Sequence, residues 1–198
     1  MKASLQIQLI ILVLLSSCLP SVKNTTFRSH PLKMNTLKST IGLLQTNGCF
    51  YSIITSNKNI IPKDYFIYFF LYDNGIARQG SFWSETELSN ERDSVIKYIE
   101  NDCEVYKKYG GSPNFGGFSV LERKITIQIM LYVPQLHWEN INWEGAIINN
   151  NTINIDTCLF QTNPLICKDN FGLNFIQMNK PDSLAQNRWR KKKWYWKH

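Results

Sequence analysis

The chain has 198 residues, of which 43% are hydrophobic and 13% aromatic, and its formal net charge is +7. This composition excludes a disordered chain, and the length suffices for one domain with its own hydrophobic core. The excess positive charge lies at the two ends, because residues 18–187 contain as many acidic as basic side chains. A domain without a basic face is a poor candidate for nucleic-acid binding.

The N-terminus carries a short apolar run that ends in small residues and a cysteine. Leu9–Leu15 is too short to span a bilayer, which takes roughly 20 apolar residues, but it fits the hydrophobic region of a secretory signal. Leu15-Ser16-Ser17-Cys18 then has the order of a lipoprotein cleavage site. We therefore expect residues 1–17 to be a lipoprotein signal peptide and Cys18 to carry acyl chains that anchor the protein to a membrane. An ordinary signal peptide cut nearby and an uncleaved anchor are the alternatives.

Composition divides the rest of the chain into three parts. Residues 18–40 are polar and unpatterned, which is typical of a tether. Residues 41–187 contain short β-rich runs separated by turn residues, and they form the predicted globular domain. Residues 188–198 are a basic, aromatic tail.

The first three predicted strands are Gly48–Thr55, Asp64–Tyr72 and Gly75–Trp83. Asn74 and Gly75 join the second strand to the third, and Asn-Gly between apolar runs is a strong signal for a β-hairpin.

A helix is expected after the third strand. Ser84-Glu85-Thr86-Glu87 has the pattern of a capping box, which predicts a helix from this point to about Glu104. The helix is expected to pack on the sheet, over one face or at one end, through apolar residues at helical spacing. These residues are Leu88, Val95, Ile96, Ile99 and Cys103.

Five further strands follow in the second half of the chain. They are predicted at Phe115–Leu121, Lys124–Val133, Trp143–Ile148, Thr152–Leu159 and Phe171–Met178. Because the connections are short, we expect antiparallel pairing. The predicted fold is therefore mainly β with one helix: about eight antiparallel strands in a small lipocalin-like barrel or a curved sandwich.

Four cysteines remain if Cys18 is acylated: Cys49, Cys103, Cys158 and Cys167. In an exported protein they permit two disulfides in three connectivities. Cys158 and Cys167 bracket a short loop and are the favoured pair, whereas buried thiols are the alternative. The chain has no CxxC motif and only three histidines, so we expect neither a metal site nor a cofactor.

The sequence offers one weak candidate for a catalytic site. His137, Glu139 and Glu144 lie near Trp138 and Trp143, and a carboxylate pair beside aromatic rings could act on a glycan. Solvated carboxylates beside packed aromatic side chains explain the same pattern. We therefore assign no catalytic residue, and an envelope hydrolase stays an alternative.

The C-terminal tail interleaves cations with aromatic rings, which suits a membrane surface or an anionic envelope polymer. A solvated end or a last packed strand is the alternative. The contact residues would be Arg188, Trp189, Arg190, Lys191, Lys192, Lys193, Trp194 and Trp196.

Several blocks of the chain, taken in order, resemble small uncharacterised lipoproteins of Bacteroidetes. The blocks are FLYDNGIARQGSF, GGFSVLERKITIQIM, GAIINNNTINI and NKPDSLAQNRW, and together they extend over about Gly48–Asn187. The resemblance implies a lipid-anchored β domain and no particular activity. Surface-exported lipoproteins of these bacteria tend to carry an acidic run after the acylated cysteine. Leu19–Asn24 has none, which favours a protein that faces the periplasm.

These observations predict a lipid-anchored protein of the cell envelope with a binding or structural role. Its expected partners are the membrane, through the acyl chains, and a small apolar ligand or an envelope polymer. A secreted, disulfide-bonded interaction protein is a further alternative, in which Asn24 and Asn150 would be glycosylation acceptors.

Overall fold

The computed structural model describes residues 21–22, 43–55, 64–109, 114–133, 137–160 and 170–182. Cys18, Cys167 and the tail at 188–198 lie outside these ranges. In β7, the side chains at positions 137–139 are also outside the description, although their backbone is within it.

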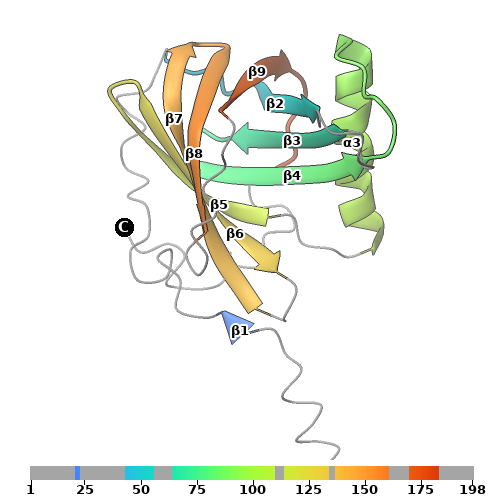
Figure 1. Ribbon diagram of the computed structural model, residues 1–198, viewed down its shortest axis with the longest axis horizontal. Coiled ribbons are helices and arrows are strands. Elements are labelled where there is room, and N and C mark those ends of the chain that lie inside the picture. The colour runs from blue at the N-terminus through green and yellow to red at the C-terminus, as the bar shows by residue number, and fades with distance from the viewer. Residues whose placement is uncertain are drawn as a thin grey trace, which may run out of the picture.

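Eight strands form a closed antiparallel barrel, which confirms the predicted fold and decides for the barrel over the sandwich (Figure 1). Each strand pairs with the next along the chain, and the last strand, β9, pairs with the first, β2. The strands are β2 (Gly48–Thr55), β3 (Asp64–Leu71), β4 (Ile76–Ser84), β5 (Asn114–Leu121), β6 (Lys124–Val133), β7 (His137–Asn149), β8 (Thr152–Phe160) and β9 (Phe171–Gln177).

A short additional strand, β1 (Ser21–Val22), lies beside the start of β7. It pairs in parallel with His137 and Trp138, beyond the point where β8 stops pairing with β7 at Ile141. The segment just after Cys18 is therefore joined to one end of the barrel.

The observed strands agree closely with the predicted ones, with one clear exception. β7 begins at His137, six residues before the predicted start at Trp143. The predicted hairpin turns are present, and in them Gly75 and Glu122 have positive φ angles of 81° and 57°.

The inner faces of all eight strands form one hydrophobic core. Leu44 enters this core from the segment before β2, and Gln45 N–H donates to the carbonyl of Asn150 at 3.2 Å, so this segment covers one end of the barrel. Trp143 lies across the interior, where its indole N–H donates to Gln79 at 3.3 Å and its ring lies 5.8 Å from that of Phe69.

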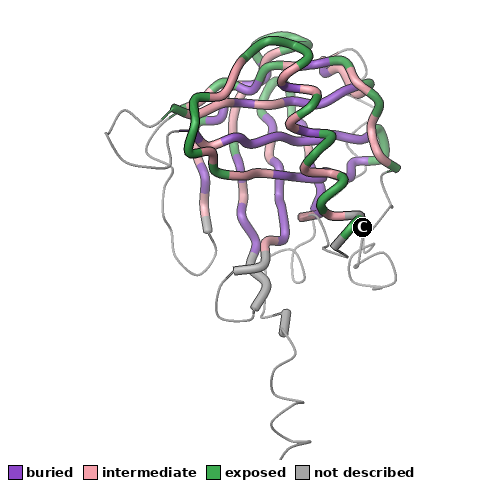
Figure 2. The backbone as a smooth tube through the Cα atoms, turned by 90° about the vertical axis from the view of Figure 1, so that its right-hand side faces the viewer, coloured by how far each residue is buried: buried purple, intermediate pink, exposed green. Residues whose placement is uncertain are grey.

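A second hydrophobic cluster lies outside the barrel, between β2–β4 and the helix α3 (Arg92–Tyr109). Figure 2 shows buried residues along the strands behind this helix. Val95 and Ile99 are fully buried there against Phe66 and Phe70 of β3. β3 therefore buries both of its faces, one in the barrel and one under α3, which explains its unbroken apolar sequence.

The predicted start of the helix was wrong. The Ser84 hydroxyl bonds to the backbone of Thr86, two residues further on, and so closes a local turn and caps no helix. The Leu88 N–H donates to the buried carboxylate of Asp64 at 2.6 Å, which holds the following segment beside β3. The helix begins only at Arg92, although its predicted apolar face does pack on the sheet as expected.

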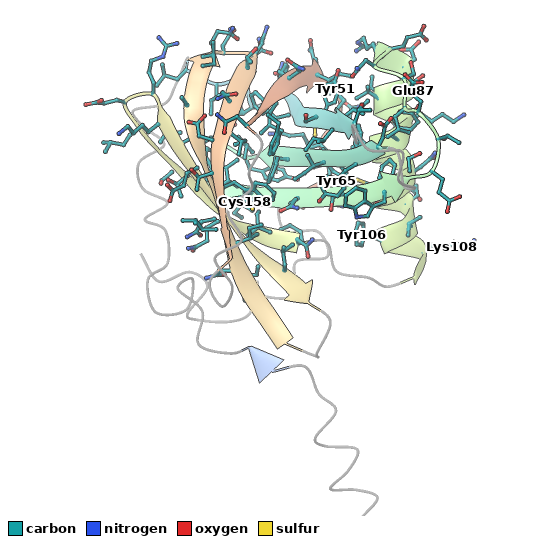
Figure 3. All side chains as sticks on the ribbon, in the orientation of Figure 1. Tyr51, Tyr65, Glu87, Tyr106, Lys108 and Cys158 are labelled. Atoms are coloured by element: carbon teal, nitrogen blue, oxygen red, sulfur yellow. The ribbon has the colours of Figure 1, made fainter. Side chains whose placement is uncertain are left out.

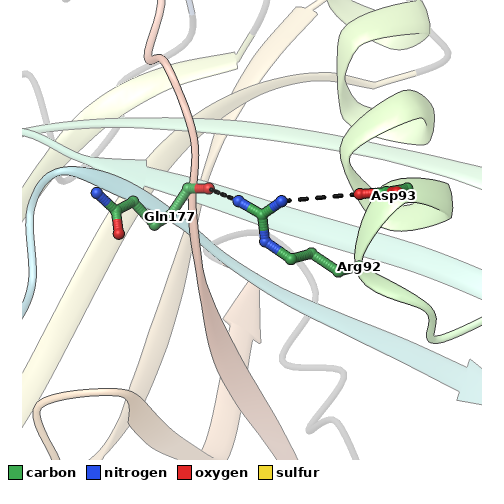
Figure 4. Close-up of polar contacts among 3 residues, drawn as sticks. All are labelled: Arg92, Asp93 and Gln177. Atoms are coloured by element: carbon green, nitrogen blue, oxygen red, sulfur yellow. Dashed lines mark hydrogen bonds and ion pairs between the residues drawn. The ribbon is translucent and has the colours of Figure 1, made fainter.

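The start of α3 is also linked to the end of β9 (Figure 4). The Arg92 guanidinium donates to the carbonyl of Gln177 at 3.2 Å and lies 3.7 Å from the Asp93 carboxylate. Because both side chains of the ion pair are exposed, this pair contributes little to stability, on the order of 0–1 kcal/mol.

Candidate functional site

A groove of about 460 Å³ lies between the middle of α3 and the segment that follows β9. This volume is within the range of small-molecule sites. The groove has an apolar part, formed by Phe70, Met178 and Pro181, and a polar part with a thiol, two carboxylates, two amides and one ammonium group. The polar residues are Cys103, Glu100, Glu104, Asn101, Asn179 and Lys180.

Lys180 is fixed in the wall of this groove. Its ammonium group donates to the carbonyl of Leu71 at 3.3 Å and lies 4.7 Å from the ring centroid of Tyr72. The Tyr72 hydroxyl in turn donates to the carbonyl of Pro181 at 2.9 Å, which ties this segment to the end of β3. Burial lowers the pKa of Lys180, while the negative charge of Asp73 opposes this shift. A bound anion would therefore stabilise the charged ammonium group.

A buried arginine lies next to the groove. Arg78 comes from β4, and only 2% of its surface is exposed. Its guanidinium lies 5.9 Å from the ring centroids of Phe70 and Phe115, and Nη2 donates to Cys103 Sγ at 3.5 Å. Arg78 Nε has no hydrogen-bond partner among the described residues.

Tyr68 connects this arginine cluster to a carboxylate. Its hydroxyl donates to Asp102 Oδ2 at 2.6 Å and lies 3.7 Å from Cys103 Sγ. Gly80 makes room for the ring, because a Cβ at that position would lie 2.1 Å from Tyr68 Cζ.

Burial dominates the ionisation of this cluster. It raises the pKa of Asp102, although the hydrogen bond from Tyr68 and the charge of Arg78 act in the opposite direction. Burial and the Asp102 charge together raise the pKa of Tyr68 well above its usual range. Tyr106, on the next turn of α3, has its pKa raised to about 12, mainly by burial.

Among the residues of the weak catalytic candidate, Glu144 is separated from His137 and Glu139. All three lie on one continuous strand, β7, and Glu144 is exposed. At about 3.3 Å per residue, the Cα atoms of Glu139 and Glu144 are roughly 16 Å apart, and residues five apart on a strand lie on opposite faces of the sheet, so these two do not form the closely spaced carboxylate pair of a glycosidase. A carboxylate pair of this kind would therefore need a different partner for Glu139.

Cys158 of the favoured disulfide lies on β8, where it is buried in the inner core. Figure 3 shows it away from Tyr106 and Lys108 of α3. Its expected partner, Cys167, is outside the described residues, so this disulfide stays a prediction.

Sequence reasoning missed Arg78, Tyr68 and Asp102 as members of a site. They come from two strands and a helix, and nothing in their local sequence indicates that α3 covers them. For Lys180 the sequence offered one indication of a role, since this residue belongs to the NKPDS block of the resemblance described above.

Within the described residues, the fold is a lipocalin-like eight-stranded barrel with one external helix. The chain matches no protein-family model, and searches of curated proteins and of solved structures find no match either. Within the described ranges, no helix is long and apolar enough to cross a membrane, and no group of three or more metal-ligating side chains is gathered.

Proposed function

We propose that this chain is a lipid-anchored binding protein of the cell envelope, and that it binds a small amphiphile with one negative charge in the groove under α3. The observation that carries this proposal is the position of Lys180, a partly buried cation fixed at the edge of an apolar surface.

The lining of the groove supports an amphiphile. Phe70, Met178 and Pro181 offer an apolar surface, and Lys180 offers a charge beside it. Glu100 and Glu104 line the same groove and would repel a second negative charge. These features favour a monocarboxylate with an apolar body.

The interior of the barrel is a weaker candidate for the ligand site. The described inward-facing side chains pack into one cluster, and the Trp143 indole lies across it between Gln79 and Phe171. We therefore assign the ligand to the external groove.

The anchor is supported by the sequence and by β1. Leu15-Ser16-Ser17-Cys18 has the order of a lipoprotein site. Ser21 pairs with His137 only three residues later, and three residues span at most about 10 Å. Acyl chains on Cys18 would thus hold the start of β7 close to the bilayer.

Isothermal titration with decanoate tests the groove. We expect the wild-type protein to bind decanoate with a Kd below about 1 mM, and Lys180→Met to bind it at least about tenfold more weakly, a loss of about 1.4 kcal/mol. Decanol should also bind at least about tenfold more weakly than decanoate, because it lacks the charge that pairs with Lys180.

Lys97→Met is the matched control, since Lys97 is exposed on α3, which borders the groove, but does not itself line it. No binding of decanoate, or the same loss in both variants, would contradict the assignment of the groove.

The mass of the N-terminal peptide tests the anchor separately. In protein purified from the membrane fraction of its native host, we expect the first residue to be Cys18 with a diacylglycerol-sized adduct. An unmodified N-terminus on a protein that fractionates away from membranes would refute the anchor, whatever the result for the groove.

A further inference from the structure

The groove exposes one thiol whose surroundings differ from those of the other described cysteines. Cys103 is partly exposed and lines the groove, whereas Cys49 and Cys158 are buried. The Cys49 sulfur faces the backbone carbonyl of Phe69 at 3.4 Å, and burial raises the pKa of that thiol.

Cys103 has a fixed cation on one side. Arg78 Nη2 points at the sulfur from 3.5 Å, and the guanidinium is almost completely buried with Nε unpartnered. A buried guanidinium favours a negative charge next to it, and a cation beside a cysteine favours the thiolate, which is the reactive form.

A route for the thiol proton lies on the other side. Tyr68 has a single hydroxyl proton and donates it to Asp102 at 2.6 Å, so its oxygen is left as an acceptor for the Cys103 thiol at 3.7 Å. Transfer of the Cys103 proton to Tyr68, with transfer of the Tyr68 proton to Asp102, moves the negative charge from the carboxylate to the sulfur. The net charge of the buried cluster does not change, so the transfer adds no charge to a desolvated site.

We propose that Cys103 is a nucleophilic thiol, activated through Tyr68 and Asp102 and held by Arg78, that reacts with small disulfides entering the groove. The thiolate attacks one sulfur of R–S–S–R, the S–S bond of the reagent breaks, and a mixed disulfide Cys103–S–S–R forms. The leaving thiolate takes up a proton, which restores the Asp102 carboxylate and releases R–SH. Cys103 is oxidised and the released half of the reagent is reduced, so no other oxidant is needed.

This inference concerns the same groove but rests on neither the acyl anchor nor Lys180. Its test uses the folded full chain and the uncharged 2-hydroxyethyl disulfide as the probe, with peptide mass mapping to measure the rate at each cysteine. We expect Cys103 to be modified at least tenfold faster than Cys49, the buried thiol with no predicted disulfide partner. In denaturant, Cys49 and Cys103 should react at similar rates. A folded-state rate at Cys103 no higher than that at buried Cys49 would overturn the proposal.

Tyr68→Phe separates activation from simple access, because it removes only the oxygen of the relay. We expect it to slow the modification of Cys103 at least fivefold and to move the pH profile of the rate upward. Tyr98→Phe is the matched control: Tyr98 lies on α3 in the same cluster, and its hydroxyl accepts only from the backbone of Ser89 among the described contacts. Equal rates in wild type and Tyr68→Phe, or the same slowing in both variants, would overturn the relay.

Arg78→Met is the second variant and should slow the modification of Cys103 at least tenfold. Because Arg78 is buried, this variant is compared only if its circular dichroism spectrum and unfolding transition show a folded barrel. If Arg78→Met does not fold, Asp102→Asn is used in its place. The asparagine keeps an acceptor for the Tyr68 hydroxyl but lacks the negative charge that accepts the proton. A rate unchanged in the folded variant would overturn the role of this cluster.

Discussion

Gly116→Ala should destabilise the barrel by about 3 kcal/mol or more, and the variant is expected to be largely unfolded or insoluble. Gly116 lies in β5, between Ala77 of β4 and Ile129 of β6. A Cβ at this position would lie 1.6 Å from the carbonyl oxygen of Gln128, and that backbone oxygen cannot move without breaking the pairing of the sheet. Denaturant titration followed by circular dichroism measures the loss.

Gly172→Ala is the matched control for this substitution. Gly172 is also a strand glycine, in β9, but it is exposed and a Cβ there would have no neighbour within 4 Å. It should leave stability unchanged or raise it by up to about 1 kcal/mol, because alanine has less conformational freedom to lose on folding. Similar losses in both variants would contradict the role assigned to close backbone approach at Gly116.

The free energy of unfolding should fall steeply at alkaline pH. Burial raises the pKa values of Cys49, Tyr68 and Tyr72 in the folded protein. In the unfolded chain these groups lose their protons near pH 8.5 for the cysteine and near pH 10 for the tyrosines. Above these values the folded state binds more protons than the unfolded state, so stability decreases as pH rises.

We expect a shallow decline from about pH 8.5 and a steeper one above about pH 10, where each buried tyrosine adds roughly 1.4 kcal/mol per pH unit. Denaturant titrations between neutral pH and pH 11 measure the slope. Tyr72→Phe should reduce the slope of the unfolding free energy above pH 10 by about 1.4 kcal/mol per pH unit. An unchanged slope in this variant would contradict the burial of its hydroxyl in the folded state.

Strand positions could be predicted from the sequence because turn residues and β-branched runs are local signals. The boundaries of β2 and β6 agree with the prediction at both ends. The unbroken apolar run of β3 predicted a strand but could not show what covers its second face. That cover is α3, which lies on the outer side of the barrel.

The predicted start of the helix was wrong because the same local sequence pattern is compatible with two different structures. A serine followed three residues later by glutamate fits a capping box, but the same hydroxyl can close a two-residue turn, as Ser84 does with Thr86. The Asp64 carboxylate, twenty-four residues before Leu88, then decides the path of the chain. This contact is non-local, so no pattern near Ser84 indicates it.

The candidate site could not be predicted for a related reason. In the sequence, Arg78 is an ordinary polar residue on an alternating strand, where a charged side chain normally faces solvent. It becomes a buried cation only because α3 brings Asp102 and Cys103 over it. The register between a helix and a sheet depends on packing, which single-sequence periodicity does not contain.

Closure of the barrel by β2 and β9 has a consequence for how the chain acquires its structure. The first and the last barrel strands are hydrogen-bonded to each other, from Gly48 with Gln177 to Tyr51 with Asn174. Bringing such distant segments together is entropically unfavourable and makes folding slow. Until the C-terminal strand has been synthesised, β2 and β8 present open edges that are prone to aggregate. A chaperone that holds the emerging chain would therefore be needed mainly until β9 has been added.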